Sequence, residues 1–269
     1  MDVQKRNNVN VSGHADATRT IVFAHGFGCD QSMWRFLTPA FDESYRTILF
    51  DLAGCGSSAR DAYDFDKYTS LDAFANDLID IIDTFATGPV VLVGHSVSAT
   101  IGALAAVKAP EKFTALVLVG ASFSFIDDGD YIGGFTRADI EELLQTLNAN
   151  YLGWASASAP AIMGAPEQPD LGLEFADSLC RADPTIAAHF ARSVFLSDNR
   201  AILPRITTPT LILQSSDDVL VPPSVGRYIQ AHIQDSVLRV IDNIGHCPHL
   251  SAPAASIDAT LAFLRDQGR

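Results

Sequence analysis

The residue best placed to do chemistry in this sequence is Ser96, within the run VGHSVS at 93–98. Apolar β-formers precede it at 90–93, and small residues with helical spacing follow it. This pattern approximates the Gly-x-Ser-x-Gly nucleophile elbow, a sharp strand-to-helix turn that exposes the serine hydroxyl at the end of a sheet. Ser98 stands in place of the last glycine of that motif. The run therefore predicts a serine nucleophile for acyl transfer.

A serine hydroxyl needs a base to remove its proton, and in this architecture an acid and then a histidine follow the serine along the chain. Among the seven histidines, His246 and His249 lie in the loop after an apolar run at 237–241. We expect His246 to be the base because it directly follows Gly245, whose missing Cβ lets the loop approach the site. His249 is the alternative candidate for the base. If it is not the base, it has a structural or hydrogen-bonding role.

The acid of such a triad orients the imidazole and stabilises its charged form without taking the proton. Asp217 and Asp218 both follow the apolar run at 210–214. Adjacent side chains in a turn point apart, so only one of the two can reach the histidine. We favour Asp218, four residues before Pro222, and Asp217 remains the alternative, otherwise a turn or capping residue.

Acyl transfer also requires hydrogen-bond donors for the oxyanion that develops on the substrate. The backbone N–H of Val97, directly after the nucleophile, is one expected donor. The second is expected from the loop HGFG at 25–28, where glycines on both sides of Phe27 let its N–H turn inward. This loop also follows a predicted strand, at 20–24.

Apolar and amphipathic runs alternate along most of the chain, which favours an α/β fold: a mostly parallel central sheet with helices on both faces. The expected strands are 8–11 at an edge, 20–24, 46–51, 90–93, 115–119, 210–214 and 237–241. The expected helices are 30–41, 71–85, the segment after Ser96, 224–232 and 254–265. In such sheets the ligand site lies at the carboxyl ends of the strands, where HGFG and the elbow both fall.

The alternation stops between about 123 and 204, where only helical patterns are found, at 136–148, 149–162, 171–180 and 184–196. Gly, Pro and Asp residues separate these patterns. We expect residues 1–122 and 203–269 to form the α/β core. Residues 123–202 are then a four-helix insertion that forms a lid over the active edge of the sheet.

Composition limits the possible functions and partners. A chain of 269 residues with 48% hydrophobic content can bury one large α/β domain. A formal net charge of -14 without a basic cluster argues against nucleic acid and anionic membranes as partners. No apolar run reaches the roughly 20 residues of a membrane span, and the polar first 20 residues do not form a signal peptide, so we expect a cytoplasmic protein. The four cysteines lack CxxC pairing, and we expect reduced thiols, no metal and no cofactor.

Several blocks of the sequence together resemble one family. They are HGFGCDQSMW at 25–34, VGHSVSA at 93–99, DYIGGF at 130–135, FLSD at 195–198, LILQSSDDVLVP at 211–222 and GHCPHLSAP at 245–253. This combination, spread over nearly the whole chain, is similar to the α/β-hydrolase group that holds the bacterial stress-signalling regulator RsbQ and the plant strigolactone and karrikin receptors. The departure from the general elbow motif at Ser98 is also similar to the plant receptors.

The resemblance implies an α/β-hydrolase fold with a Ser96, Asp218 and His246 triad and an oxyanion hole at Phe27 and Val97. It also implies a four-helix lid over an apolar pocket. The residues that it places in the pocket are Phe27, Phe125, Phe135, Trp154, Ser158, Val194, Phe195 and Val219. Ser158 stands where members often carry an aromatic residue, which implies a wider or more polar pocket.

The leading hypothesis is a serine hydrolase, an esterase or lactonase that acts on a small hydrophobic ester or lactone through an acyl-enzyme. The alternative is a signalling regulator of the RsbQ or strigolactone-receptor type, which senses a small molecule, hydrolyses it slowly and binds a protein partner such as a phosphatase. A haloperoxidase-like enzyme or a carbon–carbon bond hydrolase would share the triad. A dehalogenase is disfavoured, because its nucleophile would be an aspartate at position 96.

Overall fold

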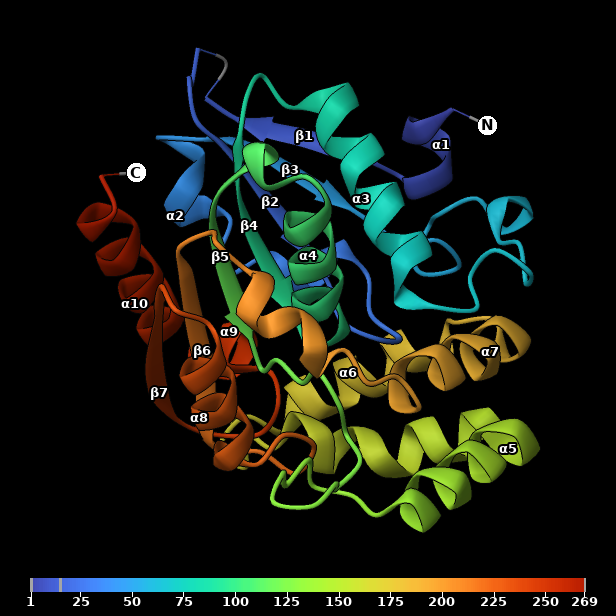
Figure 1. Ribbon diagram of the computed structural model, residues 1–269. Coiled ribbons are helices and arrows are strands. Elements are labelled where there is room, and N and C mark those ends of the chain that lie inside the picture. The colour runs from blue at the N-terminus through green and yellow to red at the C-terminus, as the bar shows by residue number, and fades with distance from the viewer. Residues whose placement is uncertain (1, 15, 269) are drawn as a thin grey trace.

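A seven-stranded sheet forms the centre of the computed structural model, which describes residues 2–14 and 16–268 (Figure 1). The strands are β1 (Asn10–Gly13), β2 (Thr20–Ala24), β3 (Arg46–Phe50), β4 (Val90–His95), β5 (Phe113–Val119), β6 (Thr210–Asp217) and β7 (Ser236–Ile244). Their order across the sheet is β1-β3-β2-β4-β5-β6-β7, and neighbours are parallel except β1 and β3. The predicted α/β class with a mostly parallel sheet is confirmed.

Helices occupy the connections between the strands. The α-helices are α1 (Val3–Asn7), α2 (Pro39–Asp42), α3 (Leu71–Phe85), α4 (Val97–Lys108), α5 (Arg137–Met163), α6 (Pro169–Cys180), α7 (Pro184–Phe195), α8 (Pro223–His232), α9 (Pro248–Ser251) and α10 (Pro253–Asp266). Short 3-10 helices are η1 (Gln31–Trp34), η2 (Arg60–Ala62), η3 (Pro110–Lys112) and η4 (Arg200–Arg205).

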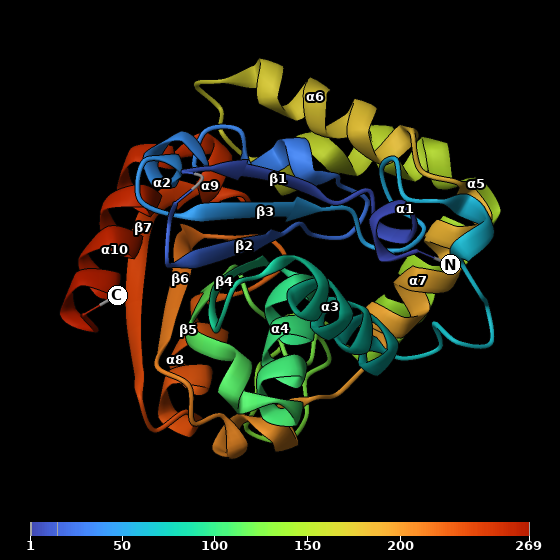
Figure 2. The same cartoon turned by 90° about the horizontal axis from the view of Figure 1, so that it is seen from above.

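The central strands are apolar on both faces because helices cover the sheet from both sides, as Figure 2 shows. Every residue of β2 and β4 is buried. Alternate side chains enter two different cores. Val22 and Leu92 pack in the core that α3, α4 and α8 share, while Phe23 and Val93 pack in the core under α2 and α10. Packing on both faces fixes the positions of the strands, and with them the ends from which the loops begin.

The helices α5, α6 and α7 lie between β5 and β6 in sequence and together cover one end of the sheet (Figure 1). Helix α5 is interrupted at Asn150, which has non-helical φ and ψ angles of -155° and 75°. The Asn150 side chain accepts a hydrogen bond from the Gly153 N–H and caps the second segment. Residues 137–195 therefore form four helical segments, and the division of the chain into a core and a lid insertion stays a prediction.

One expected element is wrong, and another is present with shifted bounds. The helix expected at 30–41 is instead η1 followed by the short α2, because Pro39 lacks a backbone N–H and interrupts the hydrogen-bond ladder. The edge strand expected at 8–11 begins at Asn10, since Asn8 adopts a left-handed conformation that ends α1. Helix α1 itself is too short to produce a periodic signal.

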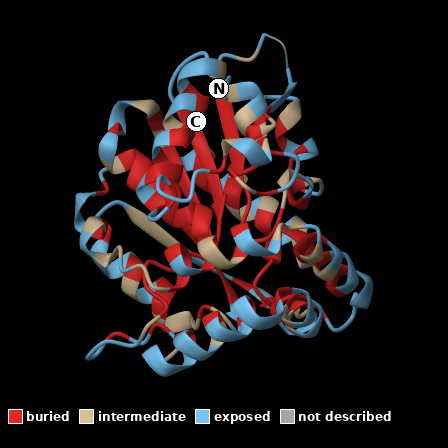
Figure 3. Ribbon diagram, turned by 90° about the vertical axis from the view of Figure 1, so that its right-hand side faces the viewer, coloured by how far each residue is buried: buried red, intermediate tan, exposed pale blue. Residues whose placement is uncertain are grey.

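Burial follows this layout. Figure 3 shows buried residues concentrated in the sheet and on the inner faces of the helices, with exposed residues on the outer faces. Among the described residues, no helix combines the length and the apolar character that a membrane crossing requires.

Candidate active site

Ser96 occupies the sharp turn between β4 and α4. Its φ and ψ angles are 54° and -121°, a conformation that non-glycine residues rarely adopt. The Ser96 N–H donates to the Val119 carbonyl at 2.8 Å, which holds the turn on the neighbouring strand β5. A Cβ on Gly94 would lie only 2.5 Å from the Ser98 carbonyl oxygen, so the turn needs a glycine there. This is the strained geometry of the predicted nucleophile elbow.

His246 faces Ser96 from the loop that follows β7. Its Nε2 lies 2.8 Å from the Ser96 Oγ, and the histidine is only 2% exposed. Gly245 has a φ of +111°, and a Cβ on it would lie 1.8 Å from the Met163 carbonyl oxygen. Only a glycine at this position therefore lets the loop pass the end of α5. The His246 N–H then donates to the Ile162 carbonyl at 2.8 Å.

Asp218 lies on the far side of the imidazole from Ser96. Its Oδ2 is 2.7 Å from the Nδ1 of His246. Its Oδ1 accepts hydrogen bonds from the Leu220 N–H at 2.9 Å and the Val221 N–H at 3.2 Å, which orient the carboxylate. The structure thus brings Ser96, His246 and Asp218 into one continuous hydrogen-bonded row.

The two alternative residues lie outside this row. Asp217 is exposed, and its backbone carbonyl accepts a hydrogen bond from the Gly245 N–H at 2.7 Å. His249 is fully buried, with its ring centroid 4.6 Å from that of Trp34. Neither nitrogen of the His249 ring has a hydrogen-bond partner among the described residues. Burial, followed by the neighbouring His246 and Arg35, lowers the pKa of His249 to about 3, so its ring stays neutral.

The two predicted oxyanion donors follow the ends of adjacent strands. Val97 is the first residue of α4, where a helix leaves its N–H without an internal partner. Phe27 lies in the loop after β2, and β2 pairs directly with β4. Within the described part of the chain, neither N–H donates to another protein group. Both N–H groups are therefore unpaired in that part of the chain, as expected of oxyanion donors.

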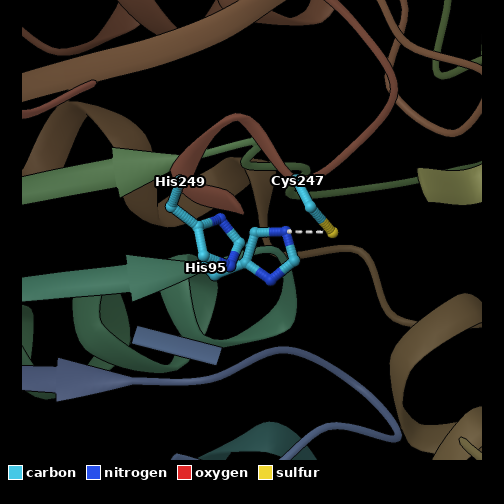
Figure 4. Close-up of side chains that lie close together, drawn as sticks. All are labelled: His95, Cys247 and His249. Atoms are coloured by element: carbon cyan, nitrogen blue, oxygen red, sulfur yellow. Dashed lines mark hydrogen bonds between the residues drawn. The ribbon is translucent and has the colours of Figure 1, made fainter. Parts of the chain in front are cut away.

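Next to His246, whose ring centroid lies 4.9 Å from that of His95, the side chains of His95, Cys247 and His249 form a buried cluster (Figure 4). Their ligand atoms lie within 4.8 Å of one another, which raises the possibility of a metal site. The His95 Nε2, however, lies 3.0 Å from the His246 carbonyl oxygen and must donate its proton there. Burial also raises the pKa of the Cys247 thiol, which disfavours the thiolate that metals bind. We therefore assign no metal to this cluster.

A cavity of about 430 Å³ opens above Ser96 and His246, between the strand ends and α5, α6 and α7. All eight residues predicted to contact substrate line it: Phe27, Phe125, Phe135, Trp154, Ser158, Val194, Phe195 and Val219. The sequence reasoning missed other lining residues: His95, Asp139, Leu143, Ala157, Ala161, Ile162, Phe175, Leu179 and Leu220. Trp154, Ala157, Ser158 and Ala161 recur at helical spacing, a signal that could have revealed this wall of the cavity.

Comparisons with known proteins place this geometry in a family. Residues 21–259 match the model of the alpha/beta hydrolase family. The chain belongs to the α/β-hydrolase family. It is 43% identical to strigolactone esterase RMS3 of Pisum sativum, over 92% of each chain. It is 37% identical to Karrikin insensitive 2 receptor CA of Petunia hybrida, over 97% of each chain.

A solved structure supports the same assignment. A hydrolase from Oleispira antarctica superposes with a TM-score of 0.94 at 38% identity, and the match covers 98% of this chain and 96% of that one. The predicted resemblance, the α/β-hydrolase fold and the hydrolase class are therefore confirmed. The catalytic roles of individual residues remain predictions.

Proposed function

We propose that this α/β-hydrolase cleaves a small apolar ester or lactone by serine catalysis. The observation that carries the proposal is the row Ser96, His246 and Asp218, joined by contacts of 2.8 Å and 2.7 Å at the floor of an apolar cavity. A serine, a base and an orienting acid at these distances are the arrangement that acyl transfer requires.

In the proposed reaction, the Ser96 Oγ attacks the carbonyl carbon while the His246 Nε2 accepts the hydroxyl proton. Asp218 holds the Nδ1–H of the resulting imidazolium. The N–H groups of Phe27 and Val97 stabilise the negative charge on the tetrahedral oxygen. When the C–O bond breaks, His246 returns the proton to the leaving alkoxide, and the acyl group stays on Ser96. In a lactone the alkoxide remains attached to the acyl group. Water, activated by His246, then releases the acid.

The cavity supports a small and mostly apolar substrate. Its volume of about 430 Å³ lies in the range of small-molecule sites, and aromatic and aliphatic side chains dominate its lining. Asp139 and Ser158 are its polar side chains away from the triad, both on α5. The relatives named strigolactone esterase support placing lactones first among the substrates to be tried. The helical insertion then serves as the lid that excludes water from this cavity.

A second candidate function is small-molecule sensing in a signalling pathway. The observation that favours it is the similarity, over 97% of the chain, to a protein named a karrikin receptor. In this role the same triad hydrolyses its ligand slowly, and the helical insertion presents a surface to a protein partner. The predicted cytoplasmic location suits both roles and remains a prediction.

The test uses p-nitrophenyl acetate and butyrate together with a set of simple lactones. Wild-type protein is expected to hydrolyse at least one of them, and Ser96→Ala is expected to lose at least about 10⁴-fold in kcat while keeping its fold. Undiminished turnover in Ser96→Ala would refute serine catalysis. Turnover that remains below about one per minute on every substrate favours the sensing role over a metabolic one.

A further inference from the structure

Ser98, which replaces the last glycine of the elbow motif, makes a hydrogen bond that a glycine could not make. Its hydroxyl donates to the His25 carbonyl at 2.5 Å, and the serine is fully buried. His25 begins the oxyanion loop, which we define as residues 25–28. Ser98 lies one residue beyond Val97, so the bond joins the helix end that carries one oxyanion donor to the loop that carries the other.

The oxyanion loop is also held from its opposite side. The Nδ1–H of the buried His25 ring donates to the Gly26 carbonyl at 2.8 Å, and its Nε2 accepts the Leu52 N–H at 3.0 Å. The His25 side chain thus fixes the loop to the end of β3, while Ser98 fixes the His25 backbone to α4. With both attachments present, the Phe27 N–H has little freedom to turn away.

His95, on the other side of the nucleophile, makes the corresponding contact with the base loop, which we define as residues 245–249. Its Nε2–H donates to the His246 carbonyl at 3.0 Å, and the two ring centroids lie 4.9 Å apart. The same ring packs against the oxyanion loop, since a Cβ on Gly26 would lie 2.6 Å from the His95 Nδ1. Burial and the neighbouring histidines hold the pKa of His95 well below its usual range, so the ring remains a neutral donor.

We propose that His95 and Ser98 are positioning residues, which attach the base loop and the oxyanion loop to the elbow that carries Ser96. The elbow thereby sets the mutual distance of nucleophile, base and oxyanion donors through two side-chain bonds, one on each side of the nucleophile. This inference rests on the proposed serine chemistry and adds two residues that act through the positions of the two loops.

The first test compares Ser98→Ala with Thr100→Val. Thr100 is a matched control because its hydroxyl also donates from α4 to a backbone carbonyl, that of Ser122, at 2.7 Å, and it is equally buried. Each variant loses one such bond, so their melting temperatures should fall by similar amounts. Ser98→Ala is expected to lower kcat about 10- to 100-fold with KM unchanged, because a misplaced donor weakens only the transition state. Thr100→Val should stay within about twofold of wild type in both constants.

Reaction with a fluorophosphonate gives a readout that does not depend on knowing the substrate. The Ser96 Oγ forms a bond to phosphorus, fluoride leaves, and His246 takes the serine proton. The rate constant of this labelling should fall in Ser98→Ala by the same 10- to 100-fold and should be retained in Thr100→Val.

The second test concerns His95. A glutamine amide places an N–H close to the position of the histidine Nε2, whereas methionine fills the space without a donor. His95→Gln is expected to label and turn over within about fivefold of wild type, and His95→Met to lose 10-fold or more. If neither His95 variant folds, the Ser98 comparison alone decides the proposal.

The outcomes are distinguishable. Equal labelling and kcat in Ser98→Ala and Thr100→Val would overturn the proposal while leaving serine catalysis intact. Failure of wild-type Ser96 to react with the fluorophosphonate or to turn over any ester would overturn the proposed function, and the positioning proposal with it. The proposal would be supported if kcat and labelling fall in Ser98→Ala but not in Thr100→Val, and if His95→Gln retains the labelling and turnover that His95→Met loses.

Discussion

The two walls of the cavity are built from different kinds of contact. The sheet wall, formed by the elbow, the oxyanion loop and the base loop, is held by hydrogen bonds of 2.5 to 3.0 Å between buried groups. The helical wall, formed by α5, α6 and α7, meets it mainly through apolar side chains, such as Trp154 and Phe195, whose rings lie 6.4 Å and 6.1 Å from that of Phe27. Hydrogen bonds are directional, whereas apolar contacts tolerate rearrangement.

This difference separates two tasks. We expect the sheet wall to place the reacting atoms, so changes in it should act on kcat. The helical wall gives the cavity its size and shape, and changes in it should act on KM. The walls are joined where α5 ends: the His246 N–H bonds to the Ile162 carbonyl at 2.8 Å, and the Ala165 N–H bonds to the Ile244 carbonyl at 3.0 Å.

The largest effect is expected from the acid of the sheet wall. Asp218→Asn should lower kcat by about 10⁴-fold, because the amide no longer favours the tautomer and charge that His246 needs. The adjacent Asp217→Asn is the matched control, since that side chain is exposed, and its kcat should stay within about twofold. Steady-state kinetics on the same ester measure both. Equal losses in the two variants would mean that the acid was assigned to the wrong residue.

The junction of the walls should be the most sensitive to a single methyl group. Gly245→Ala is expected to reduce the free energy of unfolding by more than about 2 kcal/mol, because its positive φ and the Met163 carbonyl both exclude a Cβ. Gly88→Ala adds a methyl group where no atom lies within 4 Å and should change stability by less than about 0.5 kcal/mol. Urea unfolding measures both. A stable Gly245→Ala protein would show that the loop can move away from α5.

On the helical wall, Trp154→Ala should raise KM for an apolar ester about 10- to 100-fold while kcat stays within a few-fold. The lost contact area corresponds to about 1.5–3 kcal/mol of binding. Leu173→Ala on α6, where the side chain is 65% exposed, is the control and should change neither constant. A fall in kcat with KM unchanged for Trp154→Ala would contradict the inference that the helical wall acts on KM.

The last expected effect is a dependence of stability on pH. The pKa of His249 is lowered from 6.5 to about 3, so below pH 6.5 the unfolded chain binds a proton that the folded chain does not. Stability is therefore lost as pH falls through this window, by about 2 kcal/mol at pH 5 for this histidine. His249→Phe keeps the buried aromatic ring and breaks no hydrogen bond in the described part of the chain. Its urea unfolding energy should fall less between pH 7 and pH 5 than that of the wild type, and an identical fall would refute the assignment.

Local patterns were enough to predict the strands and turns of the sheet wall. The run around Ser96 predicts a strand, a turn and a helix. The fixed order of acid and histidine along the chain narrows the choice of acid to Asp217 or Asp218 and the choice of base to His246 or His249. Which member of each pair faces the serine depends on loop geometry. Asp218 and His246 lie in the row, and their catalytic roles stay predictions.

Longer-range contacts could not be predicted in the same way. The bonds between the base loop and α5 join residues about 80 positions apart, and nothing local in either segment indicates its partner. The hydrogen bonds of His95 and Ser98 could not be predicted either. Their acceptors are backbone carbonyls, which every residue has, so the sequence does not indicate which one is bound. The helix expected at 30–41 differs from the structure for a local reason, because Pro39 lacks the N–H that a continuous helix would need there.

The central claim, that Ser96 becomes acylated, is tested most directly by mass spectrometry of the intact protein, followed by peptide mapping, after rapid mixing with p-nitrophenyl acetate. The expected result is one acetyl group on Ser96, formed by wild-type protein and absent from Ser96→Ala. Acetylation at another residue, or an equal adduct in Ser96→Ala, would contradict it.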